Sequence, residues 1–298
     1  MSLFDQMVNA AMRNSTGVGA LQIVVEKELL HHDILREMSS AGLLSGLTFF
    51  GGTCLRMCYD SNRLSENLDF TAGKDFDYAR LDGLGEILVT HLQKKYGLLV
   101  AASPPRQASD KDGGAEGNTQ TWRVKLETRP ERRDIGKQVI NIDVCTVPSY
   151  QRRPMMLKNH YGVDMGTSGL IIQAESREEI LADKLVALGL RPNRIKNRDL
   201  WDVGWLSQRG IKLPLELLPL KLGDHHCEIE AFLRLLTERM ESLTAEGNTR
   251  ASFVAEMRRF LPAAVINETL GQPQFWTYLS SVIAEYCRDA NEYLLAQK

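Results

Sequence analysis

Three side chains have the types and spacing that phosphoryl-transfer chemistry uses. Asn67 and Asp69 alternate with two apolar residues, so an extended chain carries them on one face about 6.8 Å apart, at ~3.4 Å per residue. Asp143 lies between apolar residues of a second predicted strand. Carboxylates that converge from two strands hold divalent metal ions roughly 3.5–4 Å apart in phosphoryl-transfer enzymes. A solvated strand face is the alternative, and Asn67 is an amide.

A glycine-rich turn precedes the first of these strands. Gly51, Gly52 and Thr53 follow a short apolar strand predicted over residues 47–50, and Thr53 is predicted to be the N-cap of the next helix. Glycines let the backbone approach a ligand closely, and free amides at the start of a helix favour phosphate. A purely structural turn is the alternative interpretation.

A lysine and two aspartates follow later in the chain. Lys184 is spaced four residues from apolar neighbours on both sides, which places it in the apolar stripe of a helix predicted over 176–190. Because an isolated buried charge is costly, Lys184 needs a partner. It extends its ammonium to solvent, pairs with a nearby carboxylate or reaches a triphosphate. Asp199 and Asp202 share a face of the next helix, where they would orient Lys184, position a base or cap the helix.

Positive charge gathers in the loop between these two helices. The whole chain has a formal charge of −2, from 36 basic and 38 acidic residues, which argues against a globally basic nucleic-acid coat. The loop is therefore either a solvated segment or a local docking site for an RNA backbone. Its basic members are Arg191, Arg194, Lys196 and Arg198.

The elements that must position these residues form a mixed first part and a helical second part. Residues 121–128 and 138–147 alternate between apolar and polar side chains, and turn residues between them predict an antiparallel hairpin. On its first strand, Arg123 and Lys125 point away from the apolar side. Extended chain is also predicted over 64–71, and helices over 20–40, within 75–100, and over 176–190, 197–208, 226–243, 249–260 and 272–296.

The composition is that of an ordinary globular protein. The 298 residues suffice for two domains, and 43% are hydrophobic. Five cysteines without a CxxC pair suggest neither a zinc ribbon nor a disulfide framework. The N-terminus does not have the pattern of a signal peptide, and no stretch approaches the ~18 apolar residues of a membrane span. We expect a cytoplasmic protein.

The order of these motifs resembles the nucleotidyltransferase fold of the DNA polymerase β superfamily. Within it, FFGGTCLRMCYDSNRLSENLDF (49–70) is similar to the AbiEii/AbiGii toxin family, where a GGT-x-L helix leads into R-x-S-E-D-L-D-F. Residues 178–206 look like the family's helix with an inward lysine, followed by a basic loop and R-D-x-x-D. The resemblance implies an α/β (α+β) fold, with a mixed sheet flanked by helices in residues 1–170. A helical domain over 171–298 would contribute Lys184 and the RD-x-x-D helix to the active site.

The same resemblance implies a Mg²⁺-dependent toxin that transfers NMP from an NTP to RNA. The target would be the 3′ acceptor end of tRNA, the result a block of translation, and the partner a separately encoded antitoxin. Asn67, Asp69 and Asp143 would hold the metal ions, with Asp143 as general base. The nucleotide would be bound by Gly51, Gly52, Thr53, Arg63, Ser65, Lys184, Asp199 and Asp202, and RNA by Arg191, Arg194, Lys196 and Arg198.

Asn67 departs from the family pattern, which has Asp at this position. An amide oxygen can coordinate a hard cation, but it lacks the negative charge that two Mg²⁺ ions require. Either Asn67 is an inactivating substitution of a catalytic aspartate, or the chain is naturally weak or inactive. Two other functions stay open: a small-molecule nucleotidyltransferase of the antibiotic-modifying type, and a non-catalytic homologue that binds nucleotide or RNA.

Overall fold

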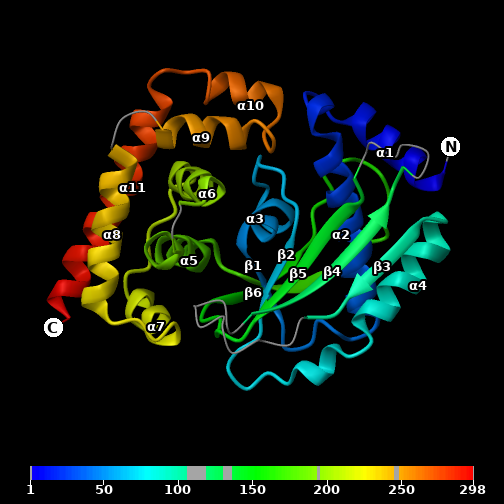
Figure 1. The fold of residues 1–298 in the computed structure, drawn as a ribbon, viewed down its shortest axis with the longest axis horizontal. Helices are drawn as coiled ribbons and strands as arrows, with labels where there is room; N and C mark the ends of the chain where they lie inside the picture. Colours follow the sequence, from blue (N-terminus) through cyan, green and yellow to red (C-terminus); the bar gives the residue numbers. More distant parts are fainter. Residues whose placement is uncertain (1, 106–118, 130–135, 193–194, 245–247, 298) are drawn as a thin grey trace. The chain divides into compact units, whose positions relative to one another are not determined.

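Alternating apolar and polar residues build a seven-stranded sheet in the first part of the chain (Figure 1). The computed structural model describes residues 2–105, 119–129, 136–192, 195–244 and 248–297. Among these, the strand order is β3-β4-β5-β2-β1-β7-β6. The strands are β1 (Thr48–Phe50), β2 (Leu68–Thr71), β3 (Leu99–Ser103), β4 (Thr119–Glu127), β5 (Gln138–Cys145), β6 (Arg152–Met156) and β7 (Ile171–Glu175).

The sheet is mixed, as the sequence predicts. Strands β4 and β5 form the predicted antiparallel hairpin, while β5 runs parallel to β2, its neighbour on the other side. Strand β1 is antiparallel to β2 and parallel to β7. Parallel neighbours require crossover connections, so strands that are far apart in the sequence lie side by side at the centre of the sheet.

Helices cover the apolar side of this sheet. Helix α2 contacts β5 and two further helices, α1 and α4, and α4 contacts β3 and β4. The apolar residues of α2 that define its predicted period, among them Leu29 and Ile34, are fully buried. Helix α3 contacts β1 and β2. The helices are α1 (Leu3–Asn14), α2 (Gln22–Ser40), α3 (Gly51–Tyr59) and α4 (Leu84–Tyr96), with 3-10 turns at Gly19–Leu21 and Tyr78–Leu81.

The start of α3 differs from the prediction. The helix begins at Gly51 and its N-cap residue is Phe50, so the assignment of Thr53 as N-cap is wrong. Gly51 has φ +75°, in the left-handed region that favours glycine, and the helix therefore begins three residues earlier than predicted.

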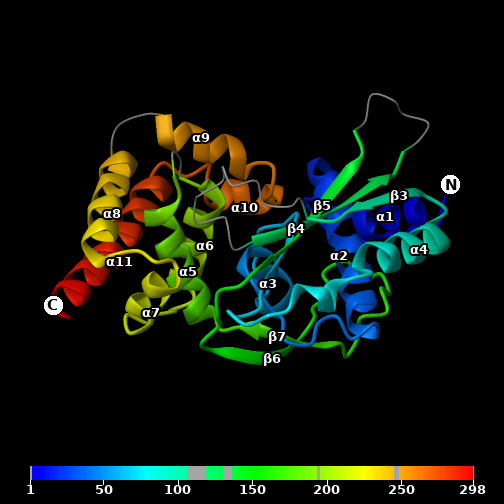
Figure 2. The ribbon, with the colours of Figure 1, turned by 60° about the horizontal axis from the view of Figure 1, so that its bottom comes forward.

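A second compact unit follows the sheet. The chain divides after Ala174, whereas the sequence analysis placed the boundary after residue 170; β7 pairs with β1, which explains the later boundary. In the second unit α5 contacts α6, α7 and α8, and Figure 2 shows α8 beside α11. The helices are α5 (Arg177–Leu190), α6 (Asn197–Gln208), α7 (Leu217–Asp224), α8 (Ile229–Thr244), α9 (Asn248–Met257), α10 (Ala263–Glu268) and α11 (Phe275–Ala296).

The predicted α/β (α+β) fold class, a mixed sheet flanked by helices and followed by helices, is thus confirmed. The sequence analysis did not predict α1, α7, α10, β3, β6 or β7. Most of these elements are short, and their hydrophobic pattern covers too few residues to define a period. Within the described residues, no helix has the length and apolar content needed to cross a membrane.

The packing of α5 against α8 yields a test of the second unit. A Cβ on Gly189 would lie 2.5 Å from Cε2 of Phe232, which is fully buried. Because overpacking of a core costs about 1–3 kcal/mol, we expect Gly189→Ala to lower the free energy of unfolding by that amount, measured with urea. Gly223→Ala is the control, since nothing lies within 4 Å of its Cβ position. Equal stability of the two variants would contradict this packing.

Candidate active site

The two candidate carboxylates lie side by side on neighbouring strands. Asp69 of β2 and Asp143 of β5 are paired residues in the parallel register. Paired residues of adjacent strands carry their side chains on the same face, about 4.8 Å apart along the hydrogen-bonding direction. Leu68 and Phe70 point to the opposite, buried face, whereas both aspartates are half-buried. The structure therefore brings together two residues that are 74 positions apart in the sequence.

The hydroxyl of Thr121 contacts one carboxylate of this pair, and Gly51 lies close to the other. The Thr121 hydroxyl donates to Oδ1 of Asp143 at 2.6 Å, and Thr121 is the register partner of Asp143 on β4. On the other side, a Cβ on Gly51 would lie 3.1 Å from Oδ2 of Asp69. The start of α3 is thus beside Asp69. Sequence reasoning did not single out Thr121 as a site residue, although Thr121 is the first residue of the strand predicted over 121–128 and shares its polar face.

Asn67 lies two residues before Asp69, at the edge of the same face. Its Oδ1 accepts a hydrogen bond from the backbone N–H of Asn141 at 3.4 Å. In the described part of the chain, no three His, Cys, Asp or Glu residues are grouped so that they could hold a metal ion. With an amide at position 67, this face has two carboxylates, Asp69 and Asp143. The oxygen donors of Asn67, Asp69 and Asp143 are nevertheless of the kind that a hard divalent cation takes.

Three predicted nucleotide-binding side chains are buried beneath this face. The hydroxyl of Thr53 donates to the backbone carbonyl of Asn67 and lies 2.6 Å from the hydroxyl oxygen of Ser65. The guanidinium of Arg63 donates to the carbonyl of Leu64 at 3.0 Å. These side chains fix the loop that leads into β2, and their contact with a nucleotide stays a prediction.

Helix α2 holds the same loop from the other side through a buried carboxylate. Glu28 accepts from the backbone N–H of Ser65 at 2.8 Å, from Arg56 Nε at 3.1 Å and from the hydroxyl of Tyr161. Burial raises the pKa of Glu28, but the charge of Arg56 and the hydrogen bonds outweigh this effect and lower it overall. The carboxylate therefore stays charged and ties α2, α3 and the Ser65 loop together.

A buried histidine adds a further contact to this loop. Nε2 of His31 lies 3.0 Å from the carbonyl of Glu66, and because a carbonyl only accepts, this nitrogen carries the proton. Burial, opposed by the charge of Glu28, lowers the pKa of His31 to about 4. His31 is therefore neutral at neutral pH.

Lys184 and its partners form a buried cluster within the second unit. The ammonium of Lys184 on α5 pairs with Asp199 and with Asp202, at 3.0 Å from Oδ2 of Asp202, and both aspartates are on α6. Burial raises the pKa of Asp199, but Lys184, Lys196 and Arg191 outweigh this effect and hold it below its usual value. The ion-pair interpretation of Lys184 thus has direct support, and its contact with a triphosphate stays a prediction.

The predicted RNA-binding loop is occupied by ion pairs where it is described. Arg191 contacts Asp199 at 2.9 Å, Lys196 lies 4.0 Å from the same carboxylate, and Arg198 contacts Glu256 at 3.3 Å. Arg194 lies outside the described residues. The carboxylates neutralise part of the positive charge of this loop, and its binding to RNA stays a prediction.

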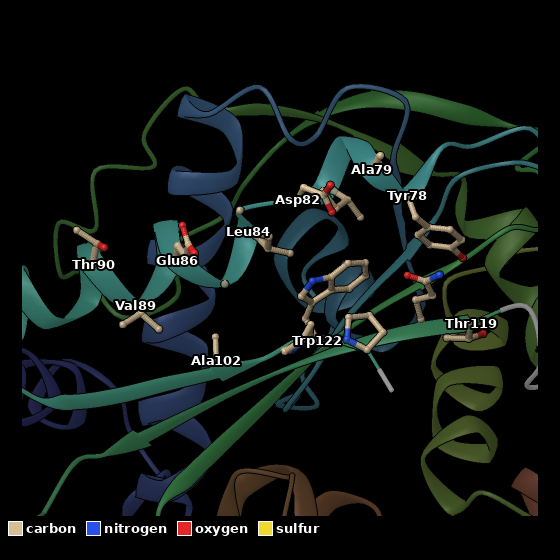
Figure 3. Close-up of a pocket in the computed structure, with 16 residues that line it drawn as sticks. Tyr78, Ala79, Asp82, Leu84, Glu86, Val89, Thr90, Ala102, Thr119 and Trp122 are labelled. Atoms are coloured by element: carbon tan, nitrogen blue, oxygen red, sulfur yellow. The ribbon is translucent and has the colours of Figure 1, made fainter. Parts of the chain in front are cut away.

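A hollow of about 990 Å³ lies elsewhere in the first unit (Figure 3). It is lined by Trp122 and Tyr78 and by residues of α4 such as Glu86. Trp122 projects from the face of β4 opposite to Thr121, because neighbouring strand residues alternate. The hollow therefore does not include the carboxylate pair, which lies half-buried on the other face of the sheet.

Comparison with known proteins gives the family. A family model described as the nucleotidyl transferase AbiEii toxin of type IV toxin–antitoxin systems matches residues 33–281. The chain belongs to this family. The predicted family resemblance is confirmed, and with it a nucleotidyltransferase of the toxin type. An NTP substrate and an antitoxin partner follow from membership in this AbiEii family.

Two solved structures from Helicobacter pylori resemble this AbiEii-family chain in fold. One is described as a candidate nucleotidyltransferase; it has 15% sequence identity and a TM-score of 0.44, and the match covers 91% of this chain and 98% of that one. The other is JHP933, with 15% identity and a TM-score of 0.44, over 92% of this chain and 94% of that one. Among curated proteins, no sequence matches this chain.

The approach of Gly51 to Asp69 can be tested by adding a methyl group. Gly51→Ala puts an alanine at φ +75° and its Cβ 3.1 Å from the carboxylate, whereas Gly42→Ala creates a similar backbone strain at φ +71° with nothing within 4 Å. A left-handed alanine costs about 1–2 kcal/mol, so we expect that loss for Gly42→Ala and a larger one for Gly51→Ala in urea unfolding. Equal losses would show that Asp69 is not adjacent to the turn.

The neutral state of His31 predicts a pH dependence of stability. Its pKa is about 4 in the folded protein, against about 6.5 unfolded, so its contribution is complete above pH 6.5 and is lost as pH falls toward 4. We expect His31→Gln, which keeps a donor for Glu66, to reduce the loss of unfolding free energy between pH 7.5 and pH 5 by about 2 kcal/mol.

The control for this measurement is His91→Gln. The His91 side chain is 27% exposed on α4 and lies 3.2 Å from Glu37, so this variant makes the same replacement at a histidine elsewhere in the same unit. If His31→Gln and the unaltered chain lose the same free energy on acidification, His31 is not buried in the neutral form.

Proposed function

We propose that the nucleotidyl transfer of this family takes place at the Asp69–Asp143 pair, with RNA as the acceptor. The pairing of the two residues across β2 and β5, beside Gly51 at the start of α3, is the observation that carries the proposal. The acceptor is the 3′ end of tRNA, and its modification blocks translation. The resemblance of residues 49–70 and 178–206 to the toxin family supports this choice of acceptor.

The donor set of the site fits Mg²⁺, which binds oxygen ligands. Asp69, Asp143 and the amide oxygen of Asn67 would hold it. Bound there, the metal lowers the pKa of the attacking hydroxyl and offsets the charge of the pyrophosphate that leaves. Two carboxylates supply less negative charge than three, and we therefore expect weak activity from the chain as it stands.

The residues of the site have separate roles in the transfer. Asp143 accepts the proton of the acceptor's 3′-hydroxyl as its oxygen bonds to the α-phosphorus and the bond to pyrophosphate breaks. The hydroxyl of Thr121 donates to Oδ1 of Asp143 and fixes the orientation of the base. The amides at the start of α3, from Gly51 to Thr53, have no acceptor within their own helix and would bind phosphate oxygens of the NTP.

A non-catalytic function is the second candidate, and one observation favours it. Asn67 accepts a backbone hydrogen bond from Asn141 with its amide oxygen, which is the atom a cation would need. If this asparagine is native to an inactive protein, restoring the carboxylate will not produce an enzyme.

The decisive experiment restores the missing charge. We expect Asn67→Asp, incubated with Mg²⁺, each of four NTPs labelled at the α-phosphate and total tRNA, to transfer label to RNA faster than the unaltered chain. Label in RNA supports the proposed toxin activity. Labelled product that forms only when small hydroxyl compounds are added to this mixture would point to a small-molecule acceptor, and no labelled product in either mixture would support the non-catalytic function.

A matched variant tests the role of the carboxylate pair. Asp143→Asn on the Asn67→Asp background keeps the size of the side chain and removes one charge and the base. Its transfer rate should fall by at least about 10²-fold, the scale of losing one group that stabilises the transition state. Circular dichroism checks that the fold is kept, and an unchanged rate would contradict the assignment of Asp143.

A further inference from the structure

Strand β4 carries two exposed cations on the face that holds the carboxylate pair. Trp122, Val124 and Leu126 are buried on one side of the strand, so Arg123 and Lys125 project from the other, where both are exposed. β4 lies between β3 and β5 (Figure 1), away from the edges of the sheet. The two cations therefore belong to the open face of the first unit.

The register places these cations in line with the site. Thr121 pairs with Asp143, Arg123 with Asn141, and Lys125 with the next residue of the same face on β5. Successive side chains on one face of a strand are about 6.8 Å apart. Arg123 and Lys125 thus lie one and two such steps from the hydroxyl that contacts Asp143, along a straight path.

The charges of these two residues are available to a ligand. Within the described parts of the chain, neither Arg123 nor Lys125 has a carboxylate partner at ion-pair distance, and Nε of Arg123 contacts only the amide oxygen of Asn141, at 3.4 Å. The basic residues of the 191–198 loop contrast with this, because Asp199 and Glu256 already pair with them. On the neighbouring strand, Ala101 and Ser103 face these cations, and both are small and exposed.

We propose that Arg123 and Lys125 bind successive backbone phosphates of the single-stranded 3′ end of the RNA acceptor. The inference rests on the proposed function, which places the terminal hydroxyl at Asp143. A polynucleotide suits this row better than an NTP does, because its phosphates recur along the strand at a spacing comparable to that of the two cations. Positively charged grooves that follow the backbone are the general means by which proteins hold single strands.

Binding to the unaltered chain tests this surface without catalysis. The probe is a fluorescein-labelled eight-nucleotide RNA with the 3′-terminal sequence of tRNA, followed by anisotropy over a range of KCl concentrations. Each phosphate contact on a single strand contributes about −0.7 to the slope of log K against log salt. For Arg123→Ala/Lys125→Ala we expect the slope to shrink by about 1.4 and affinity at 0.1 M salt to fall on the order of 10-fold.

The control variant removes one arginine and one lysine from another surface of the first unit. Arg13 on α1 and Lys94 on α4 are exposed, and Arg13→Ala/Lys94→Ala should leave the slope unchanged. An equal decrease in both double variants would show a non-specific effect of net charge and overturn the proposal. Absence of RNA binding by the unaltered chain would overturn it as well.

Kinetics on the Asn67→Asp background separate this surface from the NTP site. Arg123→Ala/Lys125→Ala on this background should raise the KM for RNA and leave the KM for NTP unchanged. A rise in the KM for NTP alone would show that the two cations bind the triphosphate, and it would overturn the proposal. If Asn67→Asp transfers nothing while binding depends on Arg123 and Lys125, the proposed function fails and the surface stands. If transfer occurs and neither binding nor KM changes, the surface fails and the function stands.

Discussion

The parallel pairing of β2 with β5 is the constraint on which the candidate site depends. It places the carboxylates of Asp69 and Asp143 on one face, at the separation of neighbouring strands. Like charges directly opposite each other destabilise a sheet, so this pair of carboxylates carries an electrostatic cost. The half-exposed position and the hydroxyl of Thr121 reduce this cost. A cation bound between the carboxylates would remove it, which connects the local strain to the proposed chemistry.

The position of this pair is maintained by polar groups buried behind it. Glu28 on α2 connects Arg56 of α3 with the backbone of Ser65, and the hydroxyl of Thr53 holds the backbone of Asn67. Breaking a buried ion pair by removing one partner costs several kcal/mol, so the loop before β2 has little freedom. Glu28 precedes residues 33–281, the range matched by the AbiEii family model. Part of the support for the site thus comes from outside the family motifs.

The basic residues of the helical unit and the two cations of β4 differ in their partners. In the helical unit, Lys184, Arg191 and Arg198 are paired with carboxylates of the same unit, so their first role is to hold α5, α6 and α9 together. On β4, the cations next to the carboxylate pair have no such partners among the described residues. This contrast is why the structure directs attention from the basic loop, which is conspicuous in the sequence, to two residues of a strand.

The sequence alone determined the features that depend on local periodicity. It predicted the face that Asn67 and Asp69 share, the β4–β5 hairpin, and α6 with the bounds observed, 197–208, because side-chain alternation and helical spacing are properties of neighbouring residues. Tertiary structure decided which strands are neighbours and in which register, and hence that Asp69 meets Asp143, that Thr121 contacts the pair, and that α3 begins at Gly51 rather than with Thr53 as its cap. Pairing of distant strands is set by the packing of the whole sheet and its helices, and no short stretch of sequence contains that information.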